Sequence, residues 1–136
     1  MPLTNTIGHE DAKRLISFIA DELAETGAGA AAAVVDPHGE LVAFLRTDGC
    51  PLPSINNAIH KAFTAAREGV ESGAIGQRSV EEGFSITNFG DLRYTGWGGG
   101  VPIIVDGETI GAVGVSGLPD EVDVAIARRA AALVAT

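Results

Sequence analysis

The sequence is poor in the residues that build disulfides and metal centres. Its 136 residues include one cysteine, Cys50, which excludes an internal disulfide and any multi-cysteine metal site. A single free thiol suits a reducing compartment. The chain also has no Ser-His-Asp order, no metal-ligand spacing and no phosphate loop of the Gly-x-x-x-x-Gly-Lys kind. We therefore expect no metal site and no chemistry based on these motifs.

Basic residues and long apolar runs are also scarce. Nine Lys and Arg stand against 18 Asp and Glu, and the formal net charge of -9 would repel a phosphate backbone or an anionic membrane surface. No apolar run nears the ~20 residues of a membrane span, and the first residues lack a basic patch followed by an apolar core. We expect a soluble, cytoplasmic protein that binds neither nucleic acid nor membranes.

Aromatic side chains make up only 5% of the chain, whereas glycine occurs 18 times. This composition predicts closely packed backbones with small side chains between them. The length fits one domain over residues 1–136, which is long enough to bury a core and too short for two ordinary domains.

The clearest local pattern is a β-hairpin near the C-terminal end. Apolar runs at 101–105 and 109–115 flank Asp106-Gly107, a dipeptide that tolerates the positive φ angles of a type I′ turn. Gly111 and Gly114 are unusual inside a strand because they pack nothing. We expect a helix or a neighbouring subunit to lie against this strand.

Periodicity and turn residues predict the other elements. Amphipathic helices are expected over 9–25, from a Ser54 cap to Gly69, and from Pro119 onward, with strands over 30–36 and 40–46. Residues 70–96 have weak periodicity, with room for one short helix around 79–82 and an irregular run after it. The order predicts an α+β fold, with an antiparallel sheet of four to five strands and helices on its faces.

Several short motifs stand in a fixed order along most of the chain. They are Ala33-Val34-Val35-Asp36 with Gly39, Leu41-Val42-Ala43-Phe44, Arg46, Asp48-Gly49, Ser54, Lys61-Ala62 with Thr64-Ala65, Gly99-Gly100-Val101-Pro102-Ile103, Gly111-Ala112-Val113-Gly114-Val115-Ser116-Gly117, and Asp123. As a set they resemble the GlcG/HbpS family, also called DUF336, the haem-degrading or PduO C-terminal-like domain. The resemblance implies a profilin-like fold, homo-oligomers and, in some members, binding of haem or corrinoid-related molecules.

Lys61 is the charged residue that we expect to anchor a site. The opposite face of its helix is apolar, so the helical period fixes the direction of its side chain, on a stripe with Asn57, Thr64 and Glu68. Covered by residues 70–96, it would hold a carboxylate or donate a proton. Alternatively, it is a surface neighbour of Glu68 or an anchor for a backbone carbonyl at the sheet edge.

Two histidines are further candidates. His60 lies on a polar stripe with Asn56, Thr64 and Arg67, where these groups can converge, although a solvated helix face explains the stripe equally well. His9 stands at the start of the first helix and is either an axial haem ligand or an inert exposed residue.

The segment around residues 81–100 supplies the other groups that a small-molecule pocket needs. These are the acids Glu81 and Asp91, the aromatic residues Tyr94 and Trp97, and the backbone of Gly98, Gly99 and Gly100. Tyr94 and Trp97 can equally anchor the loop to the core or fill a subunit interface, and the three glycines can be a flexible link.

Three functions fit these residues. The first is an oligomeric binding protein for haem or a similar flat molecule that bears a carboxylate. The second is a cofactor-independent enzyme on a small catabolic metabolite, in which Lys61, His60 or Tyr94 takes part in acid/base chemistry and the glycine backbone stabilises an oxyanion. The third is a structural subunit of a homo-oligomeric assembly, a dimer or higher.

Overall fold

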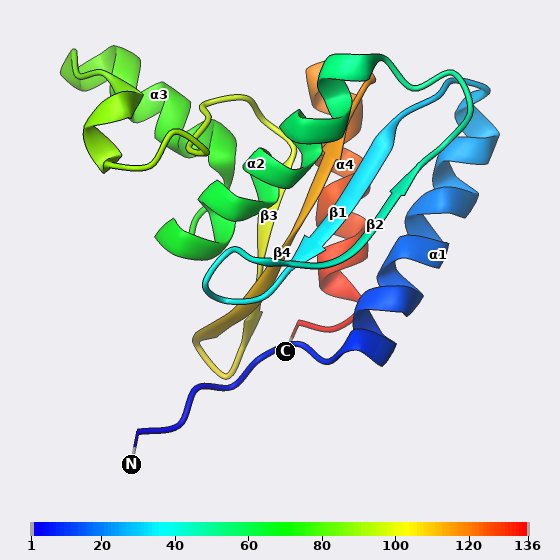
Figure 1. Cartoon of the computed structure of the whole chain (residues 1–136), viewed down its shortest axis with the longest axis horizontal. Helices are drawn as coiled ribbons and strands as arrows, with labels where there is room; N and C mark the ends of the chain where they lie inside the picture. The colour runs from blue at the N-terminus through cyan, green and yellow to red at the C-terminus, as the bar shows by residue number, and fades with distance from the viewer. Residues whose placement is uncertain (1, 136) are drawn as a thin grey trace.

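The computed structural model describes residues 2–135. Across these residues the helices are α1 (His9–Thr26), α2 (Leu52–Glu68), α3 (Ser72–Glu82) and α4 (Asp120–Ala132), with a 3₁₀ turn η1 (Ile86–Phe89); the strands are β1 (Ala31–Val35), β2 (Leu41–Arg46), β3 (Gly100–Val105) and β4 (Glu108–Ser116) (Figure 1). The strands form one antiparallel sheet in the order β2-β1-β4-β3. The predicted α+β class and the four-stranded sheet with helices packed on it are therefore confirmed.

The hairpin between β3 and β4 has the turn that its sequence predicts. Asp106 has φ 50° and Gly107 has φ 77°, so both central residues are in the positive-φ region that a type I′ turn requires. β4 then pairs with β1 on its other side, which places it inside the sheet, and β1 lies between β4 and β2. This inner position suits the continuous apolar sequence of β1, all of whose residues are buried.

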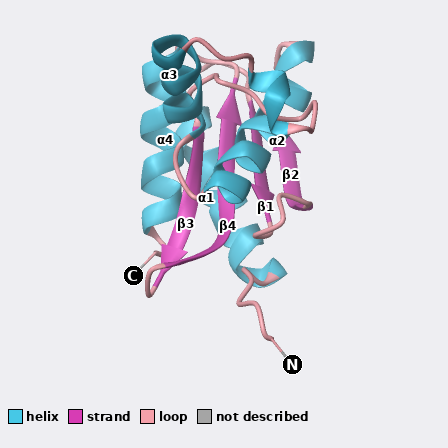
Figure 2. Cartoon of the chain, turned by 90° about the vertical axis from the view of Figure 1, so that its left-hand side faces the viewer, coloured by secondary structure: helices cyan, strands magenta, loops and turns pink. Residues whose placement is uncertain are grey.

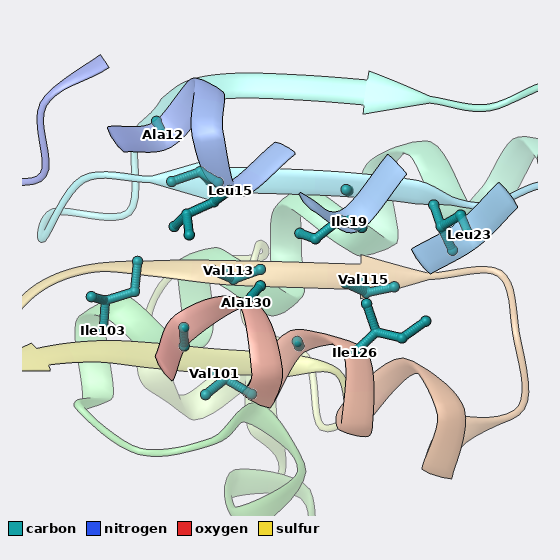
Figure 3. Close-up of a cluster of buried hydrophobic side chains, with 14 of the residues drawn as sticks. Ala12, Leu15, Ile19, Leu23, Val101, Ile103, Val113, Val115, Ile126 and Ala130 are labelled. Atoms are coloured by element: carbon teal, nitrogen blue, oxygen red, sulfur yellow. The ribbon is translucent and has the colours of Figure 1, made fainter. Parts of the chain in front are cut away.

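The two faces of the sheet differ in the size of their side chains. Residues of β1 point alternately to the two faces, so Ala32 and Val34 join one core cluster while Ala31 and Ala33 join the other. On the first face, large side chains of α1 and α4 pack against those of β3 and β4; the cluster includes Leu15, Ile19, Leu23, Ile103, Val113, Val115 and Ile126 (Figure 3). On the second face α2 packs mainly alanines, namely Ala58, Ala62, Ala65 and Ala66. Helices thus cover both faces (Figure 2).

Small side chains bring α2 unusually close to the sheet. A methyl group added at Gly114 would lie 2.0 Å from the backbone oxygen of Ala58, and one added at Gly111 would lie 2.5 Å from the backbone oxygen of Val35. The element that we expected against this strand is therefore the chain's own helix at Gly114. Because β4 is an inner strand, its glycines give no support for a subunit interface.

One prediction about local structure was wrong, and another, the short helix around 79–82, covered only the end of a longer helix. Ser54 does not cap α2, since the helix begins at Leu52 with Pro51 as its N-cap and Ser54 lies buried in the first turn. Proline suits this start because the first turn of a helix leaves its backbone N–H groups unpaired. Residues 70–96 contain the 11-residue helix α3, whose buried residues are Ser72 and Ile75, too few to give a periodic apolar pattern.

Candidate functional site

Lys61 lies in the middle of α2 and is only 4% exposed. Its ammonium Nζ donates to the backbone oxygen of Val115 at 3.0 Å and to Oδ2 of Asp123 at 3.3 Å. Asp123 belongs to α4, which covers the opposite face of the sheet, so the Lys61 side chain reaches across the end of β4 to meet it. The residue is thus both a backbone anchor and one half of a buried ion pair.

Residues 97–100 lie directly on this lysine. A methyl group added at Gly99 would be 3.1 Å from Nζ of Lys61, and one added at Gly100 would be 2.1 Å from the Lys61 backbone oxygen. Glycine is required at 100 because a side chain would collide with the Lys61 backbone, and at 99 because φ is 123° and a side chain would meet the Val115 backbone oxygen. The structure therefore brings Gly99, Gly100 and Lys61 together, while Gly98 packs against the carboxylate of Asp120.

A pocket of about 250 Å³ opens beside the ion pair. Its walls come from the first half of α2, from Trp97 and from the turn that leads from β4 into α4; the lining residues are Pro51, Ser54, Asn57, Lys61, Trp97, Ser116, Gly117, Leu118, Asp120 and Asp123. We call this the Lys61 pocket. It combines one cation, two carboxylates, hydroxyl and amide groups and an aromatic ring, which together can orient a small polar molecule.

Burial raises the pKa of the Asp123 carboxyl above its usual range. The charge of Lys61 and the backbone N–H of Leu118, which donates to Oδ1 at 3.2 Å, act in the opposite direction by stabilising the carboxylate. Asp123 is therefore a carboxyl group whose protonation depends closely on its lysine partner.

Tyr94 fastens the segment after α3 to α2. Its hydroxyl donates to Oε2 of Glu68 at 2.7 Å, its ring stacks on Phe89 at a centroid distance of 4.6 Å, and it meets the edge of Phe63 at 5.5 Å. Burial, helped by Glu68, raises the pKa of Tyr94 to about 12, so the phenol stays protonated at neutral pH. Tyr94 does not line the Lys61 pocket.

His60 and Asp91 belong to a neighbouring group of charges. Arg93 binds Asp91 through its backbone N–H at 2.9 Å and its guanidinium at 3.1 and 3.0 Å, and this lowers the pKa of Asp91 to about 2. Burial and then the charge of Arg93 lower the pKa of the half-buried His60. Both groups lie outside the Lys61 pocket.

His9 and Glu81 lie away from these groups. His9 is exposed at the start of α1, which packs on the opposite face of the sheet from α2, and its Nε2 lies 3.3 Å from Oε1 of Glu10. Glu81 is exposed on α3 and accepts a hydrogen bond from Gln77 at 3.0 Å. Neither lines the Lys61 pocket.

Two residues of the site carried weak or no sequence signals. Asp123 follows the start of α4, where an acidic residue is explained by the helix dipole alone, so its pairing with Lys61 required the tertiary structure. Ser72 is fully buried and bonds to the backbone at both Trp97 and Gly100. It could not be selected from the sequence because the short helix expected around 79–82 does not reach back to Ser72.

Residues 2–135 lack two features. No group of three or more His, Cys, Asp or Glu side chains is placed to hold a metal ion. No helix in this range has both the length and the apolar character needed to cross a membrane.

Comparison with known proteins gives consistent results. Residues 7–132 match the family model described as haem degrading protein HbpS-like. Protein GlcG of Escherichia coli strain K12 is 33% identical over 116 residues, which cover 81% of each chain. A double mutant of HbpS from Streptomyces reticuli has a TM-score of 0.90 with 25% identity, over 100% of this chain and 92% of the other. The PduOC:haem complex has a TM-score of 0.83 with 25% identity, over 93% and 94%.

Proposed function

This chain belongs to the HbpS-like family of haem-degrading proteins, and on that premise we propose that it binds a small carboxylate-bearing molecule in the Lys61 pocket. The observation that carries the proposal is the hydrogen bonding of Lys61. An ammonium has three N–H groups, and two of those on Lys61 go to Val115 and Asp123. The third is available to a ligand oxygen in the pocket that Lys61 lines.

The acidic residues of the pocket restrict the ligand further. Asp120 and Asp123 would repel a carboxylate placed beside them, and the protein as a whole is acidic. A ligand carboxylate therefore belongs next to Lys61 and Asn57. Groups that donate hydrogen bonds, such as a hydroxyl or an amine, belong on the Asp120 side.

Haem itself does not fit this pocket. The volume of about 250 Å³ lies below the roughly 300–1,000 Å³ of typical ligand pockets. The lining residues include no His, Cys, Met or Tyr, which are the usual protein ligands of haem iron. His9 and His60 are elsewhere, so we assign haem no role in the Lys61 pocket.

Haem binding elsewhere on the protein stays a prediction, supported by the haem complex of PduOC. Haemin titration should give a saturable, shifted Soret band, and His9→Ala or His60→Ala should alter it. A spectrum equal to that of free haemin would contradict this prediction.

The small-carboxylate proposal is tested by nuclear magnetic resonance of ¹⁵N-labelled protein titrated with succinate, a compact dicarboxylate. We expect shifts of the Trp97 indole and of the Gly117 and Leu118 amides. Asn57→Ala should weaken binding several-fold, because this amide lines the pocket. Asn56→Ala is the control, since it removes the same side chain from an exposed neighbouring position. Equal affinity in the two variants, or shifts confined to other residues, would refute the proposal.

A second candidate function is cofactor-independent catalysis on a small metabolite, as a lyase, isomerase or hydrolase. The observation that favours it is the Asp123 carboxyl, whose pKa burial raises and which shares the pocket with Lys61. Such a pair can take up and return a proton during a reaction. Incubation of small carboxylic acids with the protein in D₂O should then exchange a C–H next to the carboxyl group. Exchange that Asp123→Asn leaves unchanged would contradict this role.

We also propose that the protein is a homo-oligomer in the cytoplasm. Support for oligomers comes from large apolar side chains left exposed on one chain, including Val80, Leu92 and Trp97, at 84%, 85% and 65% exposure. Support for the location comes from the single free thiol, Cys50.

A further inference from the structure

We propose that Ser72 is a positioning residue that holds the Trp97 side of the Lys61 pocket in place. The side chain is fully buried at the start of α3. Its Oγ donates to the backbone oxygen of Trp97 at 2.7 Å and accepts the backbone N–H of Gly100 at 2.9 Å. One hydroxyl therefore binds both ends of the segment 97–100. Only the consequence of Ser72 for ligand binding rests on the proposed function.

The packing around Ser72 shows why the position of segment 97–100 depends on this hydroxyl. A methyl group added at Gly73 would lie 3.3 Å from Cα of Gly98, and one added at Gly76 would lie 2.3 Å from the backbone oxygen of Gly96. The first turns of α3 thus contact the segment backbone to backbone. No interlocking side chains hold the two together at these points, so Ser72 supplies the directional bonds.

The N-terminal end of α3 is also tied to α4. Glu71, the N-cap residue, accepts two hydrogen bonds from the guanidinium of Arg128 in α4, at 2.8 and 2.9 Å. This ion pair ties the residue before α3 to α4, and Ser72 is the next residue. The helix start is thereby tied to α4 through Glu71 and to the first residue of β3 through Ser72.

Without the Ser72 hydroxyl, segment 97–100 would keep few polar contacts. Gly99 accepts the backbone N–H of Val115 at 3.0 Å, and the Trp97 N–H donates to Oγ1 of Thr95 at 3.3 Å. The Trp97 carbonyl and the Gly100 N–H would both lose their partner, and the loss is costly at Gly100 because that hydrogen bond is buried. The Trp97 side chain is largely exposed, so side-chain packing does little to fix it. The position of the ring at the pocket therefore depends on the Trp97 backbone.

The test uses the free protein, because Trp97 is the only tryptophan and reports on its own position. In Ser72→Ala we expect lower fluorescence anisotropy and stronger acrylamide quenching of Trp97. Hydrogen exchange at the Gly100 amide should speed up about fivefold to tenfold, the effect of losing one net hydrogen bond. Ser72→Thr, which keeps the hydroxyl, should restore both signals toward those of the wild type.

Ser79→Ala is the matched control. It removes a hydroxyl from the same helix, one that donates to the Phe84 backbone oxygen at 2.7 Å, away from the pocket. Trp97 and Gly100 signals that change equally in both variants, or in neither, would overturn the proposal. If Ser72→Ala does not fold, hydrogen exchange in the wild-type protein tests the proposal. A Gly100 amide that exchanges as fast as exposed loop amides would contradict the bond to Ser72. A failure of succinate to bind would refute the proposed function and leave these results unaffected.

Discussion

Replacing Lys61 with methionine gives the sharpest test of the buried ion pair. The change keeps most of the aliphatic stem and removes the charge, so Asp123 stays buried without its partner. Breaking a buried pair by removing one member costs about 3–5 kcal/mol. The sequence alone predicts that this variant folds normally and only loses ligand. The geometry instead predicts a strong loss of stability.

The loss should depend on pH in a defined direction. Lys61 normally lowers the Asp123 pKa, so its removal raises further a pKa that burial already raises. The folded variant then binds a proton that the unfolded chain, with a carboxyl pKa of about 3.9, releases. Stability of Lys61→Met should therefore be greatest at low pH and fall as pH rises through the folded-state pKa, by about 1.4 kcal/mol for each unit between the two values.

Urea unfolding at about pH 5 and pH 8, followed by circular dichroism, measures this effect. Lys13→Met is the control, because Lys13 is exposed on α1 and the same change there should cost under about 0.5 kcal/mol. Adding Asp123→Asn to Lys61→Met should recover part of the loss at pH 8 and little at pH 5. A cost below about 1 kcal/mol at both pH values would refute the buried pair.

Four other measurements test the fold. Ile103→Ala and Val115→Ala should each lower the free energy of unfolding by about 2–4 kcal/mol, because both side chains are fully buried, and losses below about 1 kcal/mol in both would show that the core is misplaced. Gly114→Ala should cost at least about 2 kcal/mol in the same urea assay, because its methyl group would meet the Ala58 backbone at 2.0 Å; an unchanged midpoint would contradict that contact. Tyr94→Phe should cost about 1 kcal/mol through the lost bond to Glu68, and no loss would show that this bond does not form in solution. Sedimentation at micromolar concentration should give a dimer or larger species, whereas a mass near 13.9 kDa would argue against assembly.

The sequence predicted the elements whose signals are local. The Asp106-Gly107 turn, the amphipathic α1 and the continuous apolar β1 were all located, because turn chemistry and periodicity are written into neighbouring residues. Helix α3 was predicted only at its end, around 79–82, for the converse reason. Its Gly73 and Gly76 contact the backbone of Gly98 and Gly96, far away along the chain, and such contacts leave no periodic apolar pattern.

The candidate site was predicted only in part. The helical period gave the direction of Lys61 and hence its meeting with residues 97–100. Its partner Asp123 could not be paired with it, since the two lie on helices that cover opposite faces of the sheet. Tyr94 and Asp91 were expected at the same site, yet their side chains bond to Glu68 and Arg93. His60 is next to Lys61 in the sequence but does not line the Lys61 pocket.

The buried ion pair between α2 and α4 also affects local unfolding of the two helices. The two helices lie on separate hydrophobic clusters, which in principle allows one layer to loosen while the other persists. Because Lys61 and Asp123 join the layers at the end of β4, detaching either helix leaves a lone charge behind in the other. Slow hydrogen exchange in α2 and α4 should therefore occur through one shared opening event, and the two layers should behave as a single cooperative unit.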